Sequence, residues 1–184
     1  MKELSLNILD IAENSYKAGA EHVQILLQEK DHLLTLVIKD DGCGMTREIL
    51  EGVTNPFYTT RTTRKVGLGL PLLKLAAEQT GGTMTVESVS QKDDAEHHGT
   101  TVTATFHTDH IDFCPLGDVV ATVTTLIQGH PTIDLLFRHE TEKGTVELHT
   151  AELVAVLGED VSLAEYEVIC WIEDCLNEQY DGLS

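Results

Sequence analysis

The chain has 184 residues, 41% hydrophobic and 23% charged, which predicts a soluble globular protein of one domain with at most a small appendage. Its formal net charge of −19 disfavours binding to nucleic acid or to an anionic membrane surface. No apolar run is long enough to span a membrane, and MKELSLNILD carries acids and no small-residue cleavage site, unlike a signal peptide. The four cysteines form no CxxC pair or zinc spacing, so we expect reduced thiols in a cytoplasmic protein.

The charge is distributed unevenly along the chain. Residues 1–108 hold 10 basic and 15 acidic residues, whereas residues 109–184 hold 2 basic and 16 acidic residues. Two interpretations of the second region stay open. It is either an acidic surface that keeps the protein soluble, or a docking face for a basic partner.

Residues 4–20 predict a helix with two chemically different faces. Four polar residues share one stripe at helical spacing: Asn7, Asp10, Asn14 and Lys17. Four others are expected to face the core: Ile8, Leu9, Ala12 and Ser15. The polar stripe has the groups needed to hold a divalent cation, position a water molecule and contact a phosphate. By itself, however, it does not differ from a solvated face.

The next elements alternate between strands and helices. Residues 22–29 and 32–40 are two β-rich runs separated by two residues, which predicts a hairpin. A short helix is expected over 46–53, after which 55–70 form a loop. Pro71 suits the first turn of a helix that ends at Gly81-Gly82. Two further strands are expected over 83–90 and 100–108, joined by a polar turn.

A boundary is expected at 109–118, where Pro115 and Gly117 occur and the charge balance changes. Beyond it the sequence predicts a helix over 119–129, a hairpin formed by 132–140 and 144–150, and helices over 151–158 and 163–180. An apolar face is expected to pack the last helix against the core; its residues are Val168, Ile169, Trp171, Ile172 and Leu176.

The predicted architecture of the first region is therefore a two-layer α/β (α+β) sandwich, with helices over one face of a mostly antiparallel sheet. The βαβ alternation of a Rossmann or P-loop protein is missing, and neither GxxxxGK[ST] nor GxGxxG occurs. Residues 109–184 are expected to form a small C-terminal α/β extension.

The DDGCG stretch places a carboxylate at a strand end, just before two glycines. Glycine permits positive φ and close approach of the backbone to a ligand. An aspartate in this place can accept a hydrogen bond from an exocyclic amine, the group that distinguishes adenine from guanine. A plain turn or a calcium loop shares the pattern, although the later ligands of an EF-hand are missing.

The GLGL stretch at 67–70 opens a helix, so its amide groups suit an anion such as phosphate. The loop before it concentrates three basic residues of an acidic chain: Arg61, Arg64 and Lys65. On the first helix, Asn14 with Asp10 one turn earlier suits Mg²⁺, which keeps several waters and needs few protein ligands. Asp10 is also a candidate to orient or deprotonate a water or an acceptor hydroxyl.

The order of these motifs resembles the GHKL ATPases, which include DNA gyrase, the heat-shock chaperone, sensor histidine kinases and MutL. Residues 4–108 carry the resemblance. DIAENSYKAGA resembles the N-box, DDGCGM the DxGxG box, NPFYTTR the kinase F-box at the hinge of the ATP lid, and VGLGL the second glycine box. GGTMTVES and HGTTVTATF are similar to the closing strands of kinase ATP-binding domains.

The resemblance implies a Bergerat-type fold that binds ATP with Mg²⁺. Asn14 is the implied metal ligand, Asp40 rather than Asp41 the adenine contact, and Asp10 the catalytic candidate. The complete set of implied cofactor-binding residues is Asn14, Lys17, Asp40, Gly42, Gly44, Met45, Phe57, Thr60, Arg61, Lys65, Gly67, Leu68, Gly69, Leu70 and Thr100.

The chain departs from the family pattern in three ways. Kinases usually have Asn, and the gyrase and MutL group Glu, where this chain has the shorter Asp10, which puts a general-base role in doubt. Lys65 replaces the first glycine of the GxGLGL that kinases often have. No helical segment precedes the N-box to carry a phosphoacceptor histidine, so the acceptor is expected on a separate protein. His139-Glu140 is similar to the start of a phosphoacceptor box, but it lies in a predicted hairpin and is not expected to be phosphorylated.

Three functions are compatible with these motifs. The first is a stand-alone enzyme of the histidine kinase type that transfers the γ-phosphate to another protein or hydrolyses ATP. The second is a regulatory module, similar to the anti-sigma factors of the same superfamily, that grips a protein partner in its ATP state. The third is a degenerate relative without ATP binding, which the intact Asn14, Asp40 and glycine boxes disfavour.

Overall fold

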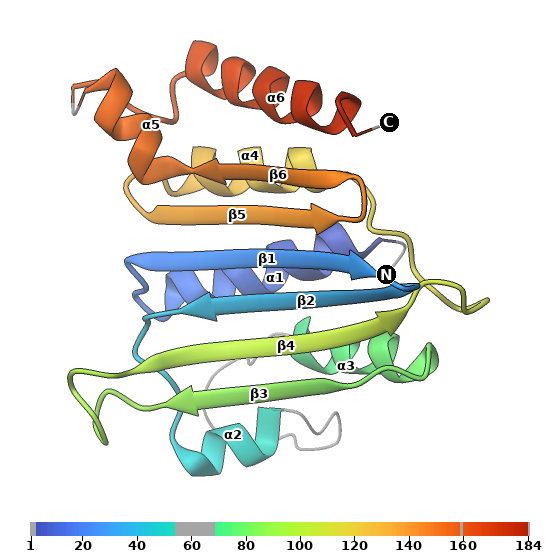
Figure 1. Ribbon diagram of the computed structural model, residues 1–184. Helices are drawn as coiled ribbons and strands as arrows, with labels where there is room; N and C mark the ends of the chain where they lie inside the picture. Colours follow the sequence, from blue (N-terminus) through green and yellow to red (C-terminus); the bar gives the residue numbers. More distant parts are fainter. Residues whose placement is uncertain (1–2, 54–68, 159, 184) are drawn as a thin grey trace.

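The computed structural model describes residues 3–53, 69–158 and 160–183 (Figure 1). Six strands form one sheet: β1 (His22–Lys30), β2 (Leu33–Asp40), β3 (Met84–Val89), β4 (Gly99–His107), β5 (Asp134–Thr141) and β6 (Gly144–His149). The helices are α1 (Leu4–Lys17), α2 (Arg47–Val53), α3 (Gly69–Gln79), α4 (Val119–Gly129), α5 (Thr150–Leu157) and α6 (Tyr166–Asp181). The elements lie close to the expected ranges, including the predicted hairpin and helices beyond residue 118.

The sheet has the strand order β3-β4-β2-β1-β5-β6. β1 and β2 form the predicted antiparallel hairpin, and β4 pairs antiparallel with both β2 and β3. β5 runs parallel to β1, with Phe137 beside Ile25, and β6 returns antiparallel to β5. Four of the five strand pairings in the described chain are therefore antiparallel, which makes the sheet mixed but mostly antiparallel.

One face of the sheet is buried under helices. Along the strands, apolar side chains such as Ile25, Ile38 and Phe137, each at most 1% exposed, alternate with more exposed side chains, some polar and some apolar. Figure 1 shows α1, α3 and α4 together behind the sheet. This period-two pattern is what one covered and one solvated face require. The predicted two-layer sandwich with helices on one face is confirmed.

The C-terminal region adds its strands to the same sheet and its α4 to the same helix layer. The amide groups of Leu4 and Ser5 donate to the carbonyls of Pro115 (2.9 Å) and Leu116 (2.8 Å), so the connection at 109–118 runs over the start of α1. At the far edge, the side chain of Gln179 on α6 makes two hydrogen bonds to the backbone of Glu147, at 3.0 and 3.2 Å. The helix thereby covers part of an otherwise unpaired strand edge.

Two side chains differ from the sequence expectation. Trp171 was expected in the core, but it is 52% exposed, whereas Ile172 and Leu176 are fully buried. Trp171 points about 100° away from Ile172 around the helix axis, which turns it off the packed face. Asn7 belongs to the predicted polar stripe but is only 2% exposed. In the described parts of the chain, none of the helices has both the length and the apolar character needed to cross a membrane.

Candidate functional site

Asp40 lies at the end of β2, where two groups fix its carboxylate. The Ser15 hydroxyl on α1 donates to Asp40 Oδ2 at 2.6 Å, and the Gly42 amide donates to Oδ1 at 3.0 Å. An ionised carboxylate offers about four acceptor positions, so both oxygens can still accept from a ligand. Asp40 thus has a fixed orientation and spare acceptor capacity.

The adjacent Asp41 has a different environment. Its Oδ1 accepts from the amides of Glu21 (2.8 Å) and His22 (2.9 Å), and its Oδ2 lies 2.7 Å from His22 Nδ1. Burial tends to raise the pKa of Asp41, but these hydrogen bonds outweigh it and hold the pKa below the usual aspartate value. Asp41 therefore anchors the start of β1, and this supports assigning Asp40 as the ligand-facing member of the pair.

The glycines that follow allow the turn to approach α1 and β3 closely. A Cβ at Gly42 would lie 2.9 Å from the Ala18 Cβ, and Cys43 donates its amide to the Ala18 carbonyl at 2.9 Å. Gly44 has φ +62°, and a Cβ there would lie 1.9 Å from the Val89 carbonyl oxygen. The turn consequently closes against the end of α1 only because these positions lack side chains.

A hydroxyl network supports the other side of this turn. The Met45 amide donates to Ser88 Oγ at 2.8 Å, and Ser88 Oγ lies 2.9 Å from Thr100 Oγ1. Thr100 is the register partner of Asp40 across β2 and β4. The structure thus brings Met45 and Thr100 into one network beside Asp40.

Gly69 brings the first turn of α3 against α1. A Cβ at Gly69 would lie 3.3 Å from the Asp10 Cβ and 3.9 Å from Asn14 Nδ2. The first amides of a helix have no partners within the helix, so they are available to an anion. The N-box and the second glycine box, more than fifty residues apart in the sequence, therefore meet in space. Leu70, the next residue, is 8% exposed and belongs to the core.

The residues of the polar stripe of α1 differ in exposure. Asp10 and Lys17 are exposed, and Asn14 between them is half-buried. An amide oxygen is a suitable hard ligand for Mg²⁺, which commonly takes one or two protein ligands together with phosphate and water. No cluster of three or more His, Cys, Asp or Glu suited to a metal occurs among the described residues.

Six of the predicted site residues lie outside the described residues: Phe57, Thr60, Arg61, Lys65, Gly67 and Leu68. Ser15, by contrast, is a site residue that sequence reasoning missed. It was expected to face the core, and it is only 4% exposed, but its hydroxyl holds Asp40. A buried hydroxyl requires a hydrogen-bond partner, and that requirement was the available signal.

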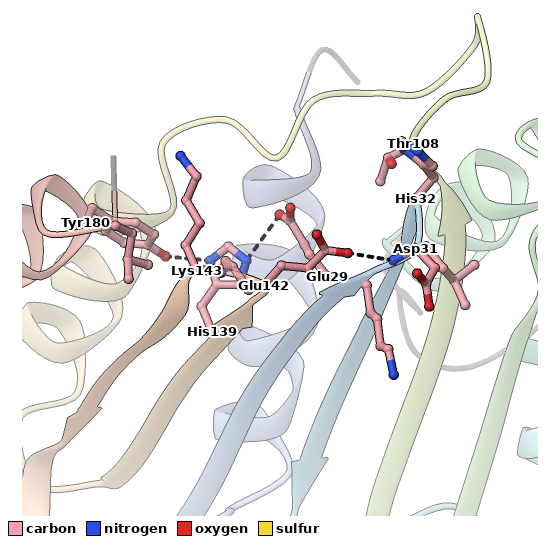
Figure 2. A pocket seen from close by; sticks show the side chains of 12 residues that line it. Glu29, Asp31, His32, Thr108, His139, Glu142, Lys143 and Tyr180 are labelled. Atoms are coloured by element: carbon pink, nitrogen blue, oxygen red, sulfur yellow. Dashed lines mark hydrogen bonds and ion pairs between the residues drawn. The ribbon is translucent and has the colours of Figure 1, made fainter.

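A hollow of about 650 Å³ lies at the other end of the sheet, where β1 and β5 meet the end of α6 (Figure 2). His139 is 3% exposed there, with Nδ1 2.8 Å from the Tyr180 hydroxyl and Nε2 3.1 Å from Glu29 Oε1. The hydrogen bond with His139 lowers the pKa of Glu29, and burial raises that of Tyr180. Both ring nitrogens are engaged, so His139 is a structural residue that ties α6 to the sheet.

Comparisons with known proteins agree with this geometry. A family model described as "Histidine kinase-, DNA gyrase B-, and HSP90-like ATPase" matches residues 1–110. Sporulation kinase E of Bacillus subtilis (strain 168) is 37% identical over 98 residues, which is 53% of this chain and 13% of that protein. Sensor protein SrrB of Staphylococcus aureus (strain NCTC 8325 / PS 47) is 34% identical over 93 residues, 48% of this chain and 16% of that protein. The chain thus spans only a small part of the curated relatives it matches.

Two solved structures share the fold. The N-terminal domain of a DNA repair protein has a TM-score of 0.55 and 17% identity, and covers 81% of this chain and 52% of that chain. The Aquifex aeolicus MutL ATPase domain complexed with ADP has a TM-score of 0.53 and 15% identity, with 81% and 63% covered. Coverage of 81% exceeds what residues 1–110 alone provide, so the shared fold extends into the C-terminal region.

The fixed Asp40, the glycine turn after it and the contact between α1 and α3 occur within the segment that the family model matches. The chain belongs to the family of histidine kinase-, DNA gyrase B- and HSP90-like ATPases.

Proposed function

We propose that the chain binds Mg²⁺ and ATP, and that it transfers the γ-phosphate to a separate protein or hydrolyses ATP in a signalling process. The observation that carries this proposal is a convergence of three features: the carboxylate of Asp40 fixed by Ser15, the Asn14 amide, and the amide-bearing start of α3 at Gly69. An adenine contact, a metal ligand and a phosphate cradle are the three components that an ATP site needs. A cytoplasmic location is part of the same proposal.

Each residue has a defined task in this proposal. Asp40 accepts a hydrogen bond from the exocyclic amine of adenine, while Ser15 and Gly42 keep its oxygens in place. The first amides of α3 bind phosphate oxygens, and the Asn14 side chain would hold Mg²⁺. Mg²⁺ when bound neutralises charge on the phosphates. Asp10, which lies at the contact between α1 and α3, would orient the attacking water or hydroxyl.

Titration calorimetry with ATP and Mg²⁺ tests the nucleotide site. Asp40→Asn replaces an acceptor oxygen with a donor and is expected to weaken ATP binding by about 100-fold, since an unpaired buried polar group adds to the lost bond. Asp41→Asn is the matched control, since Asp41 binds the start of β1, and it should change ATP affinity less than about threefold. Equal affinity of wild type and Asp40→Asn would contradict the adenine assignment.

A regulatory module with little turnover is the second candidate function. The observation that favours it is the acidic C-terminal region, which belongs to the same sheet as the site and thereby offers a partner surface rigidly joined to it. Incubation of the full chain with γ-labelled ATP distinguishes the two. Labelled acceptor protein or released phosphate in excess of the protein supports the enzyme. Tight ATP binding with neither product supports the module.

A further inference from the structure

The C-terminal helices expose large apolar side chains that the fold does not use. On α5, Val156 is 85% exposed and Leu157 37%, and Thr150 is the only one of its residues that is buried. On α6, Tyr166 is 79% exposed and Trp171 52%. A mostly apolar helix with so little buried surface is unusual for a protein without a partner, because exposed apolar patches commonly mark interaction sites. Both helices lie at the β6 end of the sheet (Figure 1).

Carboxylates border the exposed Trp171 on one side of the helix. Glu167, Asp174 and Glu178 lie four residues before it, three after it and seven after it, spacings that share one helix face. All three are exposed. Residues 144–184 contain ten Asp or Glu and no Lys or Arg, so nothing in this part of the sequence neutralises the face.

We propose that the outer face of α6, formed by Trp171 with Glu167, Asp174 and Glu178, binds a basic amphipathic segment of another protein. Charge complementarity selects this occupant. Lys or Arg side chains of such a segment can pair with the carboxylates and stack on the indole ring, while its apolar residues cover Trp171. A nucleic acid, an anionic membrane and a second copy of this chain all carry the wrong charge for this face. The proposal does not depend on ATP binding.

Trp171 provides a direct measurement, because it is the only tryptophan in the chain. Two synthetic peptides of equal length and charge serve as probes, one with Lys and Leu at amphipathic helical spacing and one with Ser replacing every Leu. The full-length protein is titrated with each while Trp171 emission is recorded. The amphipathic peptide is expected to bind, to shift the emission to shorter wavelength, and to bind more weakly as salt rises. The Ser-containing peptide is expected to produce no shift.

Two variants locate the binding. The triple variant Glu167→Gln, Asp174→Asn, Glu178→Gln is expected to weaken binding of the amphipathic peptide by about tenfold, which is the combined effect expected from losing three exposed ion pairs. The matched control neutralises Asp93, Glu96 and Asp109, which are also exposed but lie beside β3 and β4, and should leave the affinity unchanged. Trp171→Ala, followed by calorimetry, should also weaken binding. All of these surface positions leave the core intact, which circular dichroism checks.

Several results would overturn the proposal. These are no binding of the amphipathic peptide, equal binding of both peptides, or an equal loss in the two triple variants, which would indicate only nonspecific attraction to an acidic protein. A concentration-dependent dimer that Trp171→Ala abolishes would assign the face to a second copy instead. Asp40→Asn should bind the peptide like wild type, so failure of the nucleotide proposal and failure of this one give different results.

Discussion

The two regions of the chain differ in what their residues do. Residues 3–108 hold every described candidate ligand residue, on strand ends, a glycine turn, one face of α1 and the start of α3. Residues 109–183 hold none of them, although they add two strands and α4 to the same sheet and helix layer. The candidate ligand residues are thus concentrated in one region, while the other region supplies packing and most of the net negative charge. The family model ends at residue 110, where this change of role begins.

The helix α1 contacts both regions. One side of the helix meets Asp40 and Gly69, whereas the other meets α4. There the Tyr16 ring packs against His130 with centroids 4.1 Å apart and the ring planes tilted by 45°, and His130 Nε2 lies 3.0 Å from Glu13 Oε1. The C-terminal region therefore supports the helix on which Asn14 lies. A loss of packing in one region should consequently destabilise the other region too.

The largest expected effect tests this coupling through Phe137 on β5, which is fully buried beside β1. Phe137→Ala should destabilise the protein by about 3–5 kcal/mol, the usual cost of removing a buried phenyl ring. Urea unfolding followed by Trp171 fluorescence, which reports the second region, and by far-UV circular dichroism should give one coincident transition.

Leu136→Ala is the matched control, since Leu136 lies on the opposite face of β5 and is half-buried. It should cost less than about 1.5 kcal/mol, because less apolar area is lost from the protein interior. If Phe137→Ala unfolded the C-terminal region while the rest kept its circular dichroism signal, the two regions would be independent and the coupling would be wrong.

Alanine substitutions at two glycines compare how strictly the backbone of each region requires glycine. In the candidate site, Gly44→Ala would combine positive φ with a clash against the Val89 carbonyl, so it should destabilise by about 2–4 kcal/mol and abolish detectable ATP binding. At the end of α4, a Cβ at Gly129 would meet nothing within 4 Å, so Gly129→Ala should be neutral or stabilise by up to about 1 kcal/mol. Thermal unfolding and ATP titration measure both. Similar losses of stability and of ATP binding in the two variants would contradict the assignment of Gly44 to the candidate site.

Substitutions at two buried serines compare the two ends of α1. Ser15→Ala removes the hydroxyl that positions Asp40 and should weaken ATP binding by about tenfold, the worth of one hydrogen bond to a charged group. Ser5→Ala is the control, because Ser5 is equally buried but contacts the C-terminal region, and ATP affinity should not change. Calorimetry measures both affinities. Loss of affinity in Ser5→Ala of the same size would show that the effect comes from helix stability and not from Asp40.

Much of the fold could be predicted from the sequence, because the periodicity of the strands and helices agrees with their burial. The hairpin at β1 and β2 and the helix α4 occur close to the expected residues. That β5 pairs parallel with β1 was not predicted, since strand order depends on long-range packing that local patterns do not encode. Trp171 was misplaced for a related reason. At the edge of a helix's apolar stripe, a single residue faces either core or solvent depending on how the whole helix docks.

For the site, motif order grouped Asn14, Asp40 and Gly69, and in the structure Gly69 lies beside Asn14 while Ser15 holds the carboxylate of Asp40. What the sequence did not provide was the support around those residues. Ser15 and Ser88 lie within motif segments but were assigned no role there, and they act through hydrogen bonds to Asp40 and Met45. Such contacts join distant segments, so they follow only from coordinates.

The smallest expected effect concerns the place where β1 begins, between the two regions. His22 Nδ1 lies 2.7 Å from Asp41 Oδ2, and His22 Nε2 lies 3.9 Å from Asp134 on β5. The hydrogen bond to Asp41 raises the pKa of His22, so its stabilising contribution is complete below the unfolded pKa of about 6.5 and is lost as pH rises through the folded value. The lowered pKa of Asp41 has the opposite sign, and its contribution is lost as pH falls below about 4. Together the pair stabilises most between about pH 4.5 and 6.

His22→Asn should therefore lose more stability at about pH 5.5 than at pH 8, by less than about 1 kcal/mol, because both side chains are more than a third exposed and solvent screens their attraction. Urea unfolding at the two pH values measures the difference. His107→Asn is the control, since His107 is exposed and makes no ion pair with a described carboxylate, and it should leave the pH dependence of wild type unchanged. If His22→Asn also left the pH dependence of stability unchanged, the ion pair would not help to hold the two regions together. Their connection would then depend on the β1–β5 backbone pairing and the shared core alone.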